Sequence, residues 1–162
     1  MMDPDLPLAV THEVRDRCLC LQAQRAARAL ARRFDEALRP LALTNGQFSL
    51  LMSLNRPHAP RVGDLAPLLA IDRTTLSAAL KPLQRRGLVV SEPDPQDARG
   101  RRLKLSDAGR ALLKQAVPVW RRMHAAIDAE IGEARAHRIH RDLDELVKSQ
   151  AANDGAHGAG RG

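Results

Sequence analysis

Residues 72–90, DRTTLSAALKPLQRRGLVV, decide the fold of this chain of 162 residues. Leu76, Leu80 and Leu83 recur at helical spacing, which places them together on one face of a helix. Asp72 is a good N-cap for that helix, and Gly87 is the glycine expected just after its end. The next three residues are aliphatic and mostly β-branched, as in a strand. The stretch therefore predicts a helix over 72–86 that leads directly into a β-strand.

A second short helix and a returning strand lie on either side of this stretch. Residues 62–70 have the apolar period of a helix, which ends at a break over 70–72. Residues 92–100 form a turn-rich loop that contains two prolines, and residues 102–105 alternate as a strand. A helix–turn–helix followed immediately by a short hairpin is a winged helix–turn–helix, so the predicted fold class is mainly α (α+β).

Amphipathic helices flank the winged lobe. Residues 12–38 contain no Gly or Pro, and Pro40 ends their helix. Thr44 and Gln47 fit a capping box, Ser106 fits the N-cap of a helix to residue 131, and Gly132 separates it from a last helix over 133–148. The lobe closes its own small core, so the apolar stripes outside it need a second copy of the chain. We therefore expect N- and C-terminal dimerisation helices over 12–42 and 106–148, a DNA-binding lobe over 43–105, a loosely ordered N-terminus over 1–11 and a flexible tail over 149–162.

The face of the 72–86 helix opposite its leucines predicts contact with double-stranded DNA. It carries Thr74, Ala78, Lys81 and Arg85, which are the small polar or cationic side chains that suit a major groove. Residues 72–104 hold eight basic and four acidic residues, and so contribute +4 to the chain's net charge of +7. A basic helix face alone is commonly just solvated, and the basic hairpin beside it is what favours an anionic partner. The chain has two Phe, one Trp and no Tyr, which argues against stacking of single-stranded bases.

Other classes of protein are less well supported. The sequence has no glycine-rich phosphate loop, no G-x-S-x-G and no H-E-x-x-H, so we expect neither an enzyme nor a cofactor. His137 and His140 have ligand spacing and His124 lies on the preceding helix, but no further ligand completes a set, so no metal site is expected. No apolar run approaches ~18 residues and no secretory signal is visible, which favours a cytoplasmic protein without a membrane partner. A basic architectural protein that binds DNA of any sequence remains an alternative, and a footprint over one palindrome would distinguish the two.

Three motifs in order resemble the MarR family of bacterial transcriptional regulators. Residues 43–51, LTNGQFSLL, are similar to its L-T-x-x-Q-F-x-x-L helix, and residues 72–76 with 83–89 are similar to its recognition helix. Residues 94–109, DPQDARGRRLKLSDAG, resemble its wing, D-x-R-x-R followed by L-T-x-x-G. The resemblance covers residues 12–148 and implies a homodimer that binds a palindromic operator and whose repression is relieved by a ligand or an oxidant.

The resemblance and the charge pattern together define a set of expected DNA contacts. In the helix, Thr74, Thr75, Ser77 and Lys81 would face bases or adjacent phosphates. In the wing, Asp97 and Arg99 would pair to set its shape, and Arg101 or Arg102 would enter the minor groove. The full expected set is Arg73, Thr74, Thr75, Ser77, Lys81, Arg85, Asp97, Arg99, Arg101 and Arg102.

The expected effector follows from the family resemblance. The resemblance implies a small anionic, often aromatic compound, and the pocket would be lined by Phe48, Met52, Trp120 and Met123, although such residues commonly serve as plain core. Cys18 and Cys20 suggest a redox-sensing repressor as the alternative, since hydroperoxide sensors of the family carry a reactive cysteine on the first helix. Those sensors hold it with tyrosine hydroxyls, which this chain lacks. Within one helix the two thiols would point to different faces and could not pair with each other.

Overall fold

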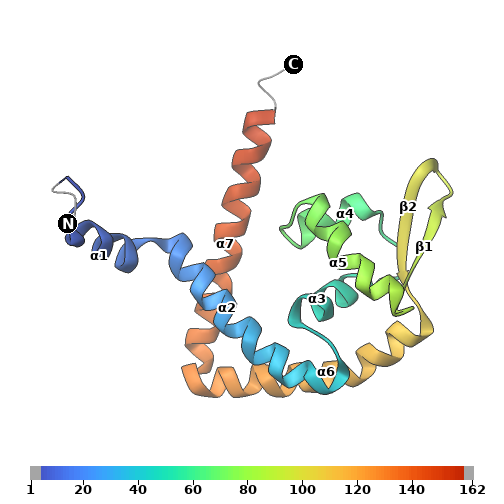
Figure 1. Ribbon diagram of the computed structural model, residues 1–162, viewed down its shortest axis with the longest axis horizontal. Helices are drawn as coiled ribbons and strands as arrows, with labels where there is room; N and C mark the ends of the chain where they lie inside the picture. Colours follow the sequence, from blue (N-terminus) through green and yellow to red (C-terminus); the bar gives the residue numbers. More distant parts are fainter. Residues whose placement is uncertain (1–4, 159–162) are drawn as a thin grey trace.

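The computed structural model describes the backbone of residues 5–158 and the side chains of residues 5–149 other than 98 and 99. Helices and two strands follow one another along the chain. They are α1 (Leu8–Arg17), α2 (Leu19–Leu38), a short 3-10 turn (Arg39–Leu41), α3 (Asn45–Ser53), α4 (Val62–Leu68), α5 (Arg73–Arg85), β1 (Val89–Asp94), β2 (Asp97–Leu105), α6 (Asp107–Ile131) and α7 (Glu133–Gly158). The long helix α6 forms the base, with α3, α4 and α5 over one half of it and the β1–β2 hairpin at its end (Figure 1). This order confirms the predicted winged helix–turn–helix.

The recognition stretch folds as its sequence predicts. The Asp72 carboxylate accepts the Thr75 backbone N–H at 2.8 Å and so caps α5. Gly87, with φ of +67°, lets the chain leave the helix, because this backbone region is open mainly to glycine. Leu76 and Leu83 are fully buried and belong to the single hydrophobic core between α2, α3, α4, α5, α6 and the hairpin. The helix continues through Pro82 to Arg85.

The hairpin is longer than expected. The strands pair antiparallel from Val89 opposite Leu105 out to Asp94 opposite Asp97, so most of the predicted 92–100 loop is strand. Pro93 is tolerated because β1 has β2 on one side only, and an edge strand does not need a donor at every position. The register shifts between Pro93 and Asp94, which marks a bulge at the outer end.

The N-terminal helix differs most from its prediction. The expected single helix over 12–38 is wrong: α1 begins at Leu8, and the chain leaves helical geometry at Cys18, whose ψ is 104°. The break is stabilised locally, since the Cys18 sulfur accepts the Leu21 N–H at 3.4 Å and the Gln22 side-chain amide donates to the Arg15 carbonyl at 2.7 Å. A helix can therefore be interrupted where side-chain hydrogen bonds stabilise the break, without the Gly or Pro that marks such a break in a sequence.

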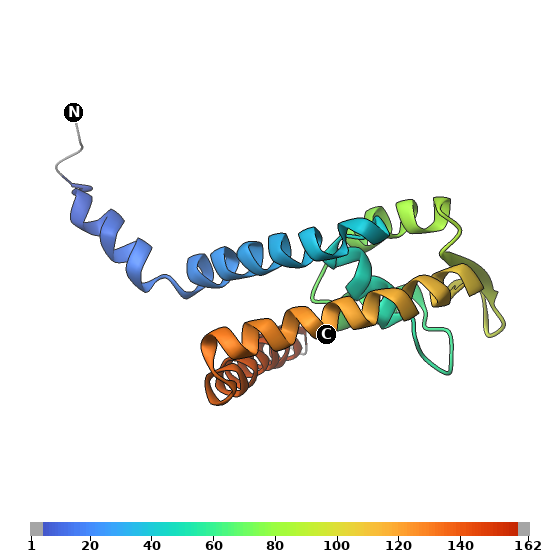
Figure 2. The same ribbon diagram turned by 90° about the horizontal axis from the view of Figure 1, so that it is seen from below.

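The last helix also extends beyond its predicted end at residue 148. The backbone of α7 is helical to Gly158. Ala151 and Ala152, which follow Gln150, have high helix propensity and favour its continuation. In Figure 2, α2 and α6 lie side by side, and α7 folds back from the far end of α6. None of the helices described is long and apolar enough to cross a membrane.

Ala70 occupies the turn between α4 and α5 in a left-handed conformation, with φ of +51°. A non-glycine residue there costs ~1–2 kcal/mol, while glycine adds ~0.4–1 kcal/mol of unfolded-chain entropy. We expect Ala70→Gly to raise the free energy of unfolding by roughly 0.5–1 kcal/mol, measured by urea denaturation. Ala111→Gly, at an exposed position inside α6, is the control and should lower it by about 1 kcal/mol. Equal destabilisation by both changes would contradict strain at this turn.

Candidate DNA-binding surface

The exposed face of α5 carries the side chains that the sequence assigns to a major groove. Thr74, Ala78, Lys81 and Arg85 are all exposed, while the opposite face is buried in the core. Ala78 is small, so it leaves the helix axis free to approach another molecule closely. The face is therefore both cationic at its C-terminal half and narrow enough for a groove.

Two flanking hydroxyls are already used within α5. Thr75 Oγ1 donates to the Asp72 carboxylate at 2.6 Å, and Ser77 Oγ donates to the Arg73 carbonyl at 2.8 Å. The Thr75 hydroxyl is the main reason that the pKa of Asp72 lies below its usual range, with the Thr75 N–H adding to it. In this arrangement Thr75 and Ser77 can offer only acceptor lone pairs to a partner.

Arg73 differs from the other predicted contacts of α5. Its guanidinium packs over Gly63 of α4, where a Cβ would come within 3.1 Å of Nη2. Arg73 also lines an apolar groove with Ile71, Leu143 and Leu146, between the α4–α5 turn and α7. One residue along a helix is about 100° around its axis, so Arg73 lies to the side of the Thr74 face.

Arg101 lies exposed on the wing and is held in place by Ser91. Its Nε donates to the Ser91 hydroxyl at 3.0 Å and its Nη2 to the Ser91 carbonyl at 3.0 Å. Glu92 and Lys104 form an ion pair across the two strands. The side chain of Arg99, and with it the predicted Asp97–Arg99 pair, lies outside the described residues.

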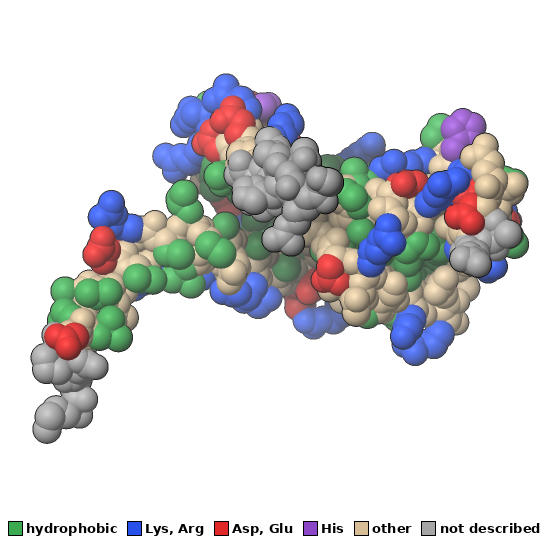
Figure 3. Space-filling view, turned by 90° about the horizontal axis from the view of Figure 1, so that it is seen from above, with side chains coloured by type: hydrophobic (Ala, Val, Ile, Leu, Met, Phe, Trp, Pro, Cys, Tyr) green, Lys and Arg blue, Asp and Glu red, His purple; other side chains and the backbone are tan. Residues whose placement is uncertain are grey.

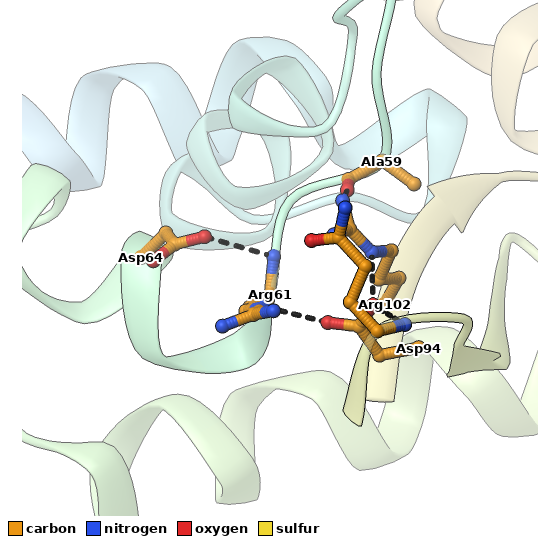
Figure 4. A network of polar contacts seen from close by, with 6 residues as sticks. Ala59, Arg61, Asp64, Asp94 and Arg102 are labelled. Atoms are coloured by element: carbon orange, nitrogen blue, oxygen red, sulfur yellow. Dashed lines mark hydrogen bonds and ion pairs between the residues drawn. The ribbon is translucent and has the colours of Figure 1, made fainter. Parts of the chain in front are cut away.

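Arg102 has a structural role that the sequence does not reveal. Its Nε donates to Asp94 at 3.0 Å and its Nη1 to the Ala59 carbonyl at 3.0 Å, and its side chain is only 27% exposed. Arg61 donates to the other oxygen of the same Asp94 carboxylate at 2.5 Å (Figure 4). In this conformation the Arg102 guanidinium is engaged by Asp94 and the Ala59 carbonyl, so Arg101 is the more exposed of the two arginines predicted for the minor groove. Replacement of Arg102 should affect folding as well as binding.

Asp94 is the centre of that arrangement. Its side chain is fully buried and also accepts the Gln96 N–H at 3.0 Å. The Gln96 N–H foremost, then the guanidinium groups of Arg102 and Arg61, lower the pKa of the Asp94 carboxyl despite its burial. Sequence reasoning placed Asp94 in the wing without a role and did not single out Arg61, because the two residues are 33 positions apart and nothing in the sequence pairs them.

The four side chains predicted to line one ligand pocket fall into a ring pair and two separate grooves. Phe48 and Trp120 stack with ring centroids 6.3 Å apart, and Phe48 is buried. Met52 lines a groove between α3 and α6, whereas Met123 lines a separate groove beside α2. The two rings belong to the packing between α3 and α6, as expected for core residues, and the two methionines lie on different grooves.

His124 extends the aromatic cluster at this junction. Its ring lies 4.3 Å from Trp120 and 5.0 Å from Phe34, centroid to centroid. Burial is the main reason that the pKa of His124 lies below its usual value, so the neutral ring is favoured. This neutral state suits its role as a packing residue between α2 and α6.

The cysteines lie at the α1–α2 break. Cys18 is partly buried and Cys20 is exposed, and the Cys20 sulfur accepts a hydrogen bond from the Gln24 amide at 3.3 Å. The helical argument against their pairing no longer applies, since Cys18 is not helical. Among the residues with described side chains, no three of His, Cys, Asp and Glu lie close enough to hold a metal ion.

Comparisons with known proteins find DNA-binding regulators of the same fold. The MarR family model matches residues 43–100, which is the winged lobe. The M. tuberculosis transcriptional regulator MosR, solved in complex with DNA, is 38% identical, with 84% of this chain and 98% of that chain covered and a TM-score of 0.75. The repressor CouR, bound to a 23-mer DNA duplex, is 28% identical over 83% of this chain and 94% of its own, also with a TM-score of 0.75.

A third relative also matches most of this chain. The transcriptional activatory protein BadR of Rhodopseudomonas palustris is 29% identical over 86% of this chain and 83% of its own. These matches span the flanking helices as well as the lobe. The chain therefore belongs to the MarR family and is a DNA-binding transcriptional regulator rather than an enzyme.

Proposed function

We propose that this regulator is a homodimeric repressor that acts in the cytoplasm, binds a palindromic operator through α5 and the wing, and is released by a small organic anion. The observation that carries the DNA-binding part is the exposed face of Thr74, Ala78, Lys81 and Arg85 beside the basic hairpin. CouR, which is a repressor with the same fold and was solved on a DNA duplex, supports the choice of repression.

Exposed apolar side chains support the homodimer. On α7, Ile139, Leu143, Leu146 and Val147 are 42–57% exposed, and α1 buries no residue. Green hydrophobic side chains also follow the arm formed by α1 and α2 (Figure 3). Contiguous apolar surface of this kind is rare on a monomer and marks an interface. Because each lobe presents one α5, two copies related by a twofold axis would read two half-sites ~10 bp apart.

A groove between α3 and α6 supports the effector. It has a volume of about 390 Å³, an apolar floor that includes Met52, Leu113 and Val117, and cations at its rim. Those cations are Arg110, Lys114 and Arg121. An apolar floor with a cationic rim fits an organic carboxylate, whose ring would lie on the floor and whose charge would face the rim. The groove also joins the lobe helix α3 to the long helix α6, so a ligand there could change how the two are placed.

Salt and charge dependence test the DNA-binding surface. Binding is measured with a duplex that the wild type selects from a random-sequence pool. Counterion release predicts that the affinity for this duplex falls by roughly 10³-fold or more between 50 and 200 mM salt. Lys81→Ala should weaken binding about tenfold and lower the salt slope by about one, as expected for one lost phosphate contact. Lys148→Ala removes the same charge from α7, where Lys148 pairs with Asp144, and should change little. Affinity that is independent of salt, or equal effects of both changes, would contradict the assigned surface.

A cysteine-based response is the second candidate function, because Cys18 lies at the α1–α2 break and Cys20 lies in the first turn of α2, where its side chain is exposed. If the thiols only pack, Cys18→Ser and Cys20→Ser should leave DNA affinity and its response to peroxide unchanged. Cys18→Ser should also lower the free energy of unfolding by ~1–3 kcal/mol, because Cys18 is partly buried. Fluorescence anisotropy with and without peroxide measures this. Release of the wild type by peroxide, and not of a serine variant, would favour an oxidant over a ligand.

A further inference from the structure

We propose that Asp94 is a positioning residue for DNA binding, which holds the outer half of the wing against the helix–turn–helix through Arg61 and Arg102. The proposal rests on the DNA-binding function. It adds Arg61, which lies outside the motifs, and it gives a role to Asp94, which the wing motif includes without one. Asp94 touches no DNA in this account. It acts through the placement of the wing cations, of which Arg101 is the described example.

Three separate elements meet at the Asp94 carboxylate. Asp94 ends β1, Arg102 lies on β2, and Arg61 is the N-cap residue of α4 (Figure 4). One carboxylate oxygen accepts Arg61 Nε at 2.5 Å, and the other accepts Arg102 Nε at 3.0 Å. The Asp94 side chain has no exposed surface, so both ion pairs lie largely out of water on its side. Charge-assisted bonds of this kind fix geometry more strongly than exposed pairs.

The backbone fixes only the inner half of the hairpin to the lobe. Leu103 N–H donates to the Pro60 carbonyl at 3.0 Å, and Arg61 forms a single antiparallel bridge with Arg102. Asp94 lies beyond that bridge, at the outer end of β1 where the register shifts, and its carboxylate also accepts the N–H of the turn residue Gln96. The carboxylate therefore links the outer turn of the wing to the segment that precedes α4. Without its charge, the outer wing could pivot about the Arg61–Arg102 bridge.

Such a pivot matters because wing and α5 must contact one duplex at the same time. A wing that is already placed loses little conformational freedom on binding, whereas a mobile one must be ordered at a cost to affinity. Removing the Asp94 charge also leaves the two partly exposed guanidinium groups of Arg61 and Arg102 without their charged acceptor, which favours their turning toward solvent. The expected consequence is weaker binding even when the core of the lobe stays folded.

The test compares Asp94→Asn with Glu92→Gln. Both remove one negative charge from β1, but the Glu92 pair with Lys104 stays within the hairpin and does not reach α4. Binding is measured with the duplex that the wild type selects from a random-sequence pool, well below the unfolding midpoint of each variant. We expect Asp94→Asn to weaken binding about tenfold, and Glu92→Gln to stay within about twofold of the wild type. Equal effects of the two changes, or wild-type affinity for Asp94→Asn, would overturn the proposal.

A double-mutant cycle separates positioning of the wing from a general loss of structure. The background variant combines Arg99→Ala with Arg101→Ala and so lacks these two wing cations. In that background the position of the wing should no longer contribute to binding, so adding Asp94→Asn should cause no further loss of affinity. A full tenfold loss in that background would show that Asp94 acts elsewhere, and unchanged affinity of the wing variant itself would also refute the proposal. If Asp94→Asn fails to fold, Arg61→Gln replaces it in the test, because it breaks only one ion pair and its side chain is 44% exposed. Arg61→Gln should weaken binding about threefold. Wild-type affinity of that variant would refute the proposal.

Discussion

Replacing Gly109 by alanine is expected to disrupt the junction between α6 and the wing hairpin. A Cβ at this position would lie 2.2 Å from the Leu88 carbonyl oxygen and 3.3 Å from Leu105 Cδ2. The same carbonyl accepts the Ser106 N–H at 3.0 Å, so it cannot move away without breaking the connection to α6. We expect the free energy of unfolding to fall by about 3 kcal/mol or more, which is a large share of the ~5–15 kcal/mol typical of a domain.

Gly46→Ala is the matched control for Gly109→Ala. Gly46 lies in the first turn of α3, and a Cβ there would meet no atom within 4 Å. Alanine is the better helix former by ~1 kcal/mol, so this variant should be as stable as the wild type or slightly more stable. Urea denaturation followed by circular dichroism measures both. A loss of less than about 1 kcal/mol for Gly109→Ala would contradict the close approach of α6 to the end of α5.

Replacing Leu143 and Leu146 together by aspartate should abolish dimerisation and operator binding at once. The two side chains are 48% and 51% exposed on α7, beside the apolar groove that reaches the α4–α5 turn. Two carboxylates buried in a dimer interface cost several kcal/mol, whereas on a monomer they would stay in water. One lobe alone spans one half-site, so loss of the dimer should remove most of the affinity.

The control places the same two charges on another face of α7. Ala134→Asp and His137→Asp have the same three-residue spacing, and both positions are exposed in a shallow basic groove. This variant should remain dimeric and keep binding, with a small loss from its lower positive charge. Sedimentation velocity and anisotropy, run on the same samples, measure both properties. A Leu143 and Leu146 variant that stays dimeric would refute the proposed interface.

Features that depend on neighbouring residues were predictable from the sequence. The caps at Asp72, Thr44 with Gln47, and Ser106 all form as predicted, because each uses a backbone N–H only three residues away. The leucine period of α5 likewise places Leu76, Leu80 and Leu83 in the core, since helical spacing alone decides which side chains share a face. The winged fold follows from these local signals in their order along the chain.

Features that depend on distant partners were not predictable. Arg102 looks like any other wing arginine until Asp94 and the Ala59 carbonyl are found beside it. Arg73 belongs to the same basic helix as Lys81, but the Arg73 guanidinium packs over Gly63 of α4, where the absence of a Cβ leaves space for it. At Cys18, side-chain hydrogen bonds break a helix that has the composition of a continuous one. In each case the deciding contact comes from tertiary packing or from a side chain that carries no positional signal.

The number of protomers on one operator duplex tests the central claim most directly. Sedimentation equilibrium of the wild type at micromolar concentration, alone and with the selected palindromic duplex, gives both masses. We expect a dimer without DNA and two protomers per duplex, joined through α7 and bound through the α5 faces of the two lobes. A stable monomer that binds the same duplex one to one, with the full affinity, would contradict the central claim.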